Sequence, residues 1–378
     1  MAGLRGKSIP QRAAPCGLAF RAGAALMRDV IDLHETSIAE LEHALESWGF
    51  KRSHAARILR SSFARGGAVS WDSLRLPAGL QARFEKSLSP PPVATAARRE
   101  SADGTTKLLL RLADGRTIES VLMPDYRPDR AAGCISSQVG CAMGCDFCAT
   151  AQNGFERNLT VGEMIGQFLA LRAEATAAGR RLQTLVFMGM GEPMLNLDNV
   201  LTAVDRIASN KLGALGCRQI TVSTVGIIPG IDALTAANPG IHLAVSLHAP
   251  DDSTRARLLP AGKRFNVADI LAAADRYQAA SGRPVTIQYC LLRGVNDSPA
   301  QARDLAALLA RRRMHVNVLR YNPTGLSLRG VAYETADDAT AEAFIAEVRA
   351  GGAVAHFRRP RGRDIDAACG QLRAREGS

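Results

Sequence analysis

The chain has 378 residues, 47% of them hydrophobic, and a formal net charge of +11. This length suffices for one large domain with smaller additions. No stretch contains the roughly 18 consecutive apolar residues that a membrane span requires, so we expect a cytoplasmic protein without membrane segments.

The first 28 residues are expected to be a basic extension. They contain five basic residues and no acidic residue, and they include Met27. One interpretation is a disordered tail, and a second is a misassigned start with Met27 as the true first residue. An acid-free, arginine-bearing start is also typical of an organelle transit peptide.

Residues 29–89 are expected to form a small helical domain. Ser37 followed by Glu40 fits a capping box, in which each side chain accepts a hydrogen bond from a backbone amide at the start of a helix. The positive net charge favours a polyanionic partner, and arginines of a second helix over 53–65 are candidates for phosphate contacts. These arginines are Arg57, Arg60 and Arg65.

Residues 90–130 are expected to be a linker that contains a β-hairpin. Three consecutive prolines at 90–92 mark its start. Two apolar runs, 107–112 and 117–123, flank Asp114-Gly115, which is a typical hairpin turn sequence.

From residue 131 to residue 350 the sequence alternates between strand-like and helix-like segments. Amphipathic segments at 161–174, 197–208 and 300–312 are expected helices. Repeated βα units predict a parallel sheet, either open or curled into a partial barrel. Strands are expected at 133–139, 184–189, 219–224, 241–247, 284–291 and 315–320, with a last strand at 353–357 in a C-terminal segment over 351–378.

Cysteines carry the strongest chemical signal. Three of the eight form Cys141-x3-Cys145-x2-Cys148, with Phe147 before the last. Three thiolates on one loop can hold three irons of a 4Fe–4S cubane, and the open fourth iron can chelate S-adenosylmethionine (SAM). The alternative is a structural zinc site, which needs four ligands and would use Cys134 as the fourth.

Small or polar residues follow most of the expected strands, where the functional groups of α/β barrels gather. Each of these residues also has an ordinary explanation. Gly191 and Glu192 could form a plain turn, the two serines, Ser223 and Ser246, could cap helices, and His248 could be structural. Beside a cluster, the glycine would let backbone approach SAM and the glutamate could accept from its amino group. The residues are Gly191, Glu192, Ser223, Ser246, His248 and Asn322.

Longer segments resemble the RlmN/Cfr family of radical SAM RNA methyltransferases, and its RlmN branch in particular. The resemblance extends over residues 36–372, and two cysteine-bearing segments are its most specific parts. The segments that carry it are 134–152, 188–196, 246–250 and 361–372.

The resemblance implies an α/β fold in which 131–350 forms a partial (β/α)6 radical SAM barrel. It implies methylation of carbon 2 of an adenosine in 23S rRNA, with tRNA as a second candidate substrate. The alternatives are methylation of carbon 8, as in the Cfr branch, and a radical SAM enzyme with a non-RNA substrate. Segment 324–330 departs from the family pattern, which leaves the RNA specificity open. We expect a monomer that receives electrons from a carrier such as flavodoxin or ferredoxin.

Cofactor contacts follow from the resemblance by position. Cys141, Cys145 and Cys148 match the ligands of one 4Fe–4S cluster. The positions that match SAM contacts are Gly191, Glu192, Ser223, Ser246, Leu247, His248 and Asn322.

The resemblance also implies three catalytic residues. Cys369 matches the cysteine that carries the methyl group, Cys134 the partner that forms a disulfide with it, and Glu119 the proton acceptor. Without the resemblance, Cys369 would be interpreted as an ordinary tail cysteine and Glu119 as a solvated hairpin residue.

Overall fold

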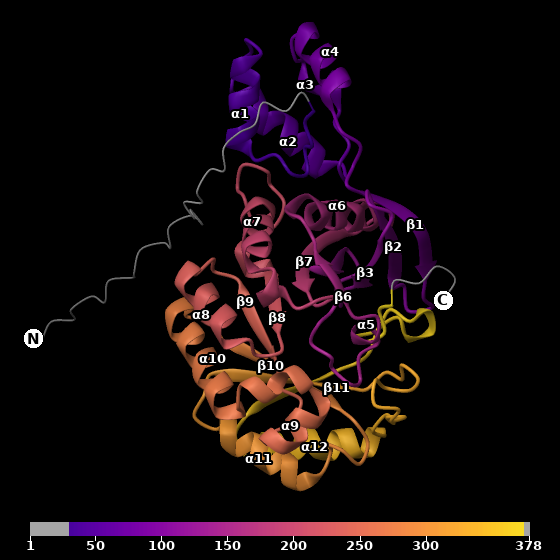
Figure 1. Cartoon of the computed structure of the whole chain (residues 1–378), viewed down its shortest axis with the longest axis vertical. Helices are drawn as coiled ribbons and strands as arrows, with labels where there is room; N and C mark the ends of the chain where they lie inside the picture. The colour runs from indigo at the N-terminus through magenta and orange to yellow at the C-terminus, as the bar shows by residue number, and fades with distance from the viewer. Residues whose placement is uncertain (1–29, 374–378) are drawn as a thin grey trace, which may run out of the picture.

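Figure 1 shows the computed structural model, which describes residues 30–373. Ten strands form one sheet in the order β1-β2-β3-β4-β7-β8-β9-β10-β11-β12. From β4 to β12 every neighbouring pair is parallel, which confirms the predicted open (β/α)6 barrel. The parallel strands are β4 (Arg130–Ile135), β7 (Arg181–Phe187), β8 (Ile220–Thr224), β9 (His242–Ser246), β10 (Val285–Leu291), β11 (Met314–Arg320) and β12 (Val354–Arg358).

Helices connect successive parallel strands, and most of them bury apolar residues in the same core as the sheet. The helices expected at 161–174, 197–208 and 300–312 are α6, α7 and α11. The full set is α5 (Ala149–Gln152), α6 (Val161–Ala177), α7 (Leu197–Ile207), α8 (Ile228–Ala237), α9 (Asp252–Leu258), α10 (Val267–Ser281), α11 (Pro299–Leu309) and α12 (Asp338–Ala350).

An antiparallel extension, residues 93–124, continues the sheet beyond β4. The predicted hairpin is confirmed as β2 (Thr106–Leu112) and β3 (Thr117–Pro124). The sequence did not predict β1 (Val93–Glu100), which pairs with β2 at the edge of the sheet. Seven of its eight side chains are exposed, so it lacks the alternating pattern by which strands are recognised. The segment expected to be a linker is therefore part of the main sheet.

The strand expected at 133–139 is divided in two. β4 ends at Ile135, and β5 (Gln138–Gly140) pairs instead with β6 (Phe155–Asn158) in a small second sheet. The Ser136 hydroxyl donates to Glu119 O at 2.8 Å and accepts from the Met190 N–H at 2.9 Å. These bonds hold the turn between the two strands, where the chain changes direction within the core.

The N-terminal segment contains the helices α1 (Ile38–Ser47), α2 (His54–Ala64), α3 (Trp71–Leu74) and α4 (Ala78–Ser87), which lie at the top of Figure 1. The predicted capping box at Ser37 and Glu40 is present. Arg206 of α7 is buried and donates to the carbonyl oxygens of Leu33, His34 and Thr36, which fixes this segment to the barrel.

The expected last strand is β12, and it is followed by the C-terminal loop, residues 359–373. In Figure 1 this loop (yellow) returns beside α5 and the antiparallel extension. The basic extension over 1–28 lies outside the described residues. None of the helices between residues 30 and 373 combines the length and apolarity that a bilayer crossing requires.

Candidate active site

The loop between β5 and α5 carries the three cysteines of the predicted cluster. The Cys141 N–H donates to Gly154 O at 2.7 Å and the Cys148 N–H donates to Cys145 O at 3.0 Å, so backbone hydrogen bonds fix both ends of the loop. Burial raises the pKa of Cys141 to about 12, and burial also raises the pKa of Cys145 and Cys148. Thiolates at this depth need a compensating cation, which the irons of a cluster would provide.

The positions of the cysteines also test the zinc alternative. Cys134, the candidate fourth ligand, lines a different pocket from Cys141 and Cys145. Among residues 30–373, no three Cys, His, Asp or Glu side chains converge on the position of a single metal ion. Zinc needs four ligands around one ion, whereas each thiolate of a cubane binds a different iron. The geometry therefore fits a cluster better than zinc.

The three cysteines open onto a pocket that contains most of the predicted SAM contacts. The pocket is open to solvent on one side and is lined by apolar side chains together with a few polar ones, as is typical of a cofactor site. Its walls come from the cysteine loop and from the ends of β7, β8, β9 and β11, as expected for this end of a parallel barrel. The predicted residues that line it are Cys141, Cys145, Cys148, Gly191, Glu192, Ser223, Ser246, His248 and Asn322.

Glu192 joins the ends of two strands at this pocket. Its Oε1 accepts from the Met194 N–H at 3.0 Å, and its Oε2 accepts from the Val225 N–H at 2.8 Å. Burial raises the pKa of Glu192 to about 7. A carboxylate oxygen can accept a second hydrogen bond, so Glu192 retains capacity for the amino group of SAM.

Gly191 is required by packing as well as by any bound cofactor. Its φ is +103°, and a Cβ there would lie 2.6 Å from Gln138 Cβ. Gln138 Oε1 in turn accepts from the Glu192 N–H at 2.8 Å. A side chain at Gly191 would therefore displace the residue that orients Glu192.

The cap interpretation does not hold for Ser223 and Ser246. The N-cap of α8 is Ile227 and that of α9 is Asp251, so neither serine begins the helix that follows it. Both serines line the pocket instead. Leu247, a further predicted SAM contact, is fully buried behind Ser246 and does not line the pocket.

His248 combines a structural contact with a place at the pocket. Its Nδ1 accepts from the Cys290 N–H at 3.0 Å, and its ring packs edge-on against Phe147 at 5.0 Å between centroids. Burial lowers the pKa of His248 to about 3, so the ring is neutral at physiological pH. Nδ1 of His248 therefore has a structural role, as the ordinary explanation expected. The residue also lines the pocket.

A second pocket adjoins the first and shares Cys369 and Asn322 with it. Cys134 lines only this second pocket. Asn322 Nδ2 donates to Cys369 O at 3.3 Å, whereas its buried Oδ1 has no hydrogen-bond partner among the described residues. That orphaned acceptor suits a ligand with a donor group. Four arginines also line this pocket, namely Arg320, Arg358, Arg359 and Arg361.

Cys134 and Cys369 are both free cysteines. Cys369 is exposed and Cys134 is 8% exposed. Burial, and then the proximity of Cys369, raise the pKa of Cys134 to about 12. Cys134 is therefore a thiol at neutral pH and must lose its proton before it can act as a nucleophile.

Glu119 is not the solvated hairpin residue that the sequence alone suggested. It is 1% exposed, and its Oε1 lies 2.9 Å from Lys107 Nζ. Its Oε2 accepts from the Arg373 N–H at 2.7 Å. Glu119 does not line either pocket. In this structure its carboxylate contacts the C-terminal loop at Arg373, on the C-terminal side of Cys369.

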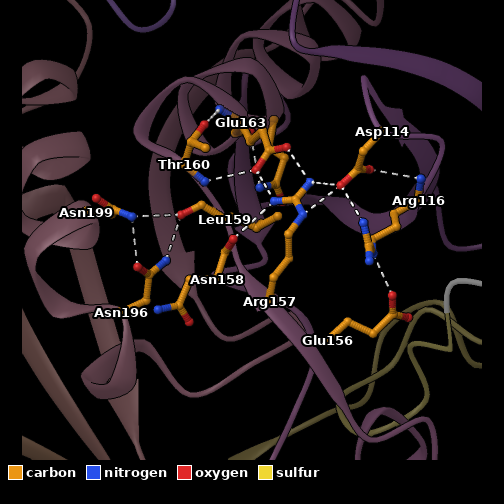
Figure 2. Close-up of polar contacts among 11 residues, drawn as sticks. Asp114, Arg116, Glu156, Arg157, Asn158, Leu159, Thr160, Glu163, Asn196 and Asn199 are labelled. Atoms are coloured by element: carbon orange, nitrogen blue, oxygen red, sulfur yellow. Dashed lines mark hydrogen bonds and ion pairs between the residues drawn. The ribbon is translucent and has the colours of Figure 1, made fainter.

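A polar network holds the far end of the cysteine loop in place (Figure 2). Arg157 of β6 donates to both oxygens of Glu163 at 2.7 and 2.8 Å and to Asp114 at 2.7 Å. It thereby joins the hairpin turn to the first turn of α6. Asn196 donates to Leu159 O at 2.9 Å and links the same segment to the start of α7. This network fixes β6, and through it the loop that carries the cysteines.

Comparisons with known proteins agree with this geometry. The family model "Radical SAM superfamily" matches residues 135–306. The "Probable dual-specificity RNA methyltransferase RlmN 1" of Opitutus terrae is 69% identical over 91% of this chain and 97% of that relative. The "Probable dual-specificity RNA methyltransferase RlmN" of Rhodopirellula baltica is 43% identical over 90% of each chain.

The chain belongs to the RlmN family of radical SAM enzymes. A solved structure titled as a radical SAM methyltransferase from Sphaerobacter thermophilus superposes with a TM-score of 0.84. It is 41% identical and covers 91% of this chain and 100% of that chain. The predicted family and fold are therefore confirmed.

Several residues of this RlmN-family site were not predicted from the sequence. Gln288 and Arg320 line the first pocket, and Lys107 pairs with Glu119. Gln288 had a usable signal, because it is a polar residue within the apolar run of β10. Lys107 had none, since a lysine in a hairpin is usually solvated.

Proposed function

We propose that this protein methylates carbon 2 of an adenosine in 23S rRNA, with tRNA as a second substrate, through a methyl group carried on Cys369. The observation that carries the proposal is the meeting of Cys369 and Cys134 in a pocket beside the predicted SAM site. Two relatives are named as dual-specificity RNA methyltransferases, which supports the choice of two RNA substrates.

The chemistry explains why two cysteines are needed. Carbon 2 of adenine lies between two ring nitrogens and is too electron-poor to attack the methyl group of SAM directly. A thiolate is a good nucleophile, so Cys369 can take the methyl group by displacement. Cys141, Cys145 and Cys148 would hold the 4Fe–4S cluster, which supplies the electron that cleaves a second SAM and so activates the methyl carbon.

Release of the methylated RNA is the proposed task of Cys134. Its thiolate attacks the Cys369 sulfur and breaks the bond from sulfur to the carbon on the adenine. That carbon keeps the bonding pair and takes up a proton to become the methyl group, and a Cys134–Cys369 disulfide is left. Glu119 is the proposed acceptor of the ring proton. Glu119 lines neither pocket, so the C-terminal loop that contacts its carboxylate must move before the ring proton can reach it.

The remaining roles follow from the same proposal. Six residues that line the first pocket, Gly191, Glu192, Ser223, Ser246, His248 and Asn322, are the proposed SAM contacts. Leu247 can take part only through its backbone, because its side chain is fully buried. The enzyme acts as a monomer in the cytoplasm, and a carrier such as flavodoxin or ferredoxin reduces the cluster and restores the two thiols.

Nucleoside mass spectrometry of rRNA and tRNA will test the proposed product. In cells that lack the protein, C2-methyladenosine should fall to background in 23S rRNA and in the target tRNAs, and the intact gene should restore it. A gene that encodes Cys369→Ala is the matched control and should not restore it. C8-methyladenosine in its place would contradict carbon 2, and unchanged levels of both would contradict RNA methylation.

The arginines at the second pocket should bind RNA phosphates. Replacing Arg358 and Arg359 by glutamate should weaken binding of an rRNA fragment by about tenfold or more and make the affinity less sensitive to salt. Filter binding over a range of salt concentrations measures both effects. Arg313→Glu, which reverses an exposed charge before β11, is the control. An unchanged affinity and salt slope in the double variant would contradict this role.

A further inference from the structure

Lys107 is a buried charged residue for which the proposed chemistry has no role. It lies on β2 of the antiparallel extension and is 4% exposed. Its Nζ is 2.9 Å from Glu119 Oε1 and donates to Asp366 O at 3.2 Å. A buried ion pair of this kind adds little stability over apolar residues of the same size, whereas removing one partner is costly. The pair is therefore better explained by what it positions.

The Lys107–Glu119 pair holds the C-terminal loop at two points on either side of Cys369. Lys107 binds the carbonyl of Asp366, three residues before Cys369, and Glu119 accepts from the N–H of Arg373, four residues after it. One rigid pair on adjacent strands thus fixes both ends of the segment that carries the thiol.

Other contacts make the same loop the link between two parts of the fold. On the antiparallel extension, Ser101 donates to Asp364 Oδ1 at 2.5 Å. On the opposite side, the Ala149 N–H donates to Gly370 O at 2.7 Å and Thr150 Oγ1 donates to Leu372 O at 2.8 Å. Ala149 and Thr150 are the first two residues of α5 and directly follow the predicted cluster ligand Cys148. Cys369 is therefore held between the antiparallel extension and the cysteine loop.

We infer that Lys107 is a positioning residue, which acts through Glu119 and Asp366 to hold Cys369 at the junction of the two pockets. The inference rests on the proposed role of Cys369 as the methyl carrier. It gives the antiparallel extension a part in the reaction, and it gives Glu119 a second task besides proton transfer. A thiol displaced by even 1 Å from its productive position would lose most of its reactivity.

Lys107→Met, Lys107→Arg and Glu119→Gln separate this role from proton transfer. In Lys107→Met, hydrogen exchange of the amides over 366–373 should be about tenfold faster or more, and trypsin should cleave after Arg373 sooner. Lys107→Arg should restore most of the protection because it keeps the charge. Glu119→Gln removes the base but keeps an oxygen that can accept from Arg373, so its loop should stay more protected than that of Lys107→Met. Arg99→Met, an exposed change on β1, should behave as wild type.

The kinetic readout concerns the holoenzyme. In Lys107→Met, kcat for RNA methylation should fall by about 100-fold, while KM for RNA should stay within about twofold because the arginines of the second pocket are intact. Loss of protection throughout the chain would indicate unfolding by the unpaired Glu119. The double variant Lys107→Met/Glu119→Gln then decides, because it is neutral and still lacks the donor to Asp366.

Wild-type exchange over 366–373 in Lys107→Met, or in the double variant when the single variant unfolds, would overturn the inference. Hydrogen exchange does not depend on the identity of the RNA product. Detection of C8-methyladenosine would therefore contradict the proposed function and leave this inference standing.

Discussion

Replacing Cys134 by alanine should trap RNA on the protein. The variant retains Cys369, the proposed cluster ligands and the proposed SAM contacts, so on the proposed mechanism it can attach the adenosine to Cys369 through the methyl carbon. It lacks the thiolate that breaks this bond, so the adduct should accumulate. A band that survives denaturing electrophoresis and disappears with nuclease is the expected observation. Methylated RNA released by this variant should fall by several orders of magnitude.

Cys369→Ala should fail at an earlier step. Without a thiol to accept the methyl group, no carbon on the protein can bond to RNA, so neither adduct nor product should form. The double variant should also show no adduct, because attachment precedes release. Cys217→Ala, a change in the short 3-10 helix before β8, is the control and should form product normally. Full methylation by either single variant would refute the proposed roles of the two cysteines.

Loss of any one of Cys141, Cys145 or Cys148 should remove the cluster. Wild-type protein purified without oxygen should be brown and contain about four irons per chain. Each alanine variant should lose most of its iron, acid-labile sulfide and visible absorbance, because burial disfavours the remaining thiolates without irons to compensate them.

Cys290→Ala is the matched control for the cluster ligands. Cys290 lies in the same pocket, but its backbone N–H, which alanine also has, makes the contact with His248. Iron content should therefore stay near the wild-type value. A colourless wild-type protein with stoichiometric zinc and no iron would contradict the cluster and restore the zinc interpretation.

The parallel barrel was predictable because each βα unit has a local signal. Strands buried on both faces are apolar runs, and amphipathic helices separate them. The cluster loop was predictable for a different reason, since three ligands within eight residues must lie near one another whatever the surrounding fold. The end of β9 was equally clear: Ser246 and His248 line the pocket that their position in the sequence implied.

Long-range polar partners were not predictable from the same sequence. Glu119 resembles a solvated hairpin residue until the C-terminal loop covers it, and Lys107 resembles any lysine of a hairpin. β1 was missed because it is an exposed edge strand whose main contribution is backbone pairing. In each case the deciding contact joins segments that no local pattern relates.

The contacts of the C-terminal loop also bear on the order in which the parts of the chain fold. Ser101 and Asp364 are 263 positions apart, and Lys107 and Asp366 are 259 apart. Contacts this distant close the longest loops of the chain and tend to form late in folding, after the local βα units. The βα units up to β11 can therefore form before the segment that carries Cys369, the proposed methyl acceptor, is docked. β12 ends at Arg358, close to Cys369 in the sequence, so the last strand of the sheet and this thiol take their places at nearly the same stage of folding.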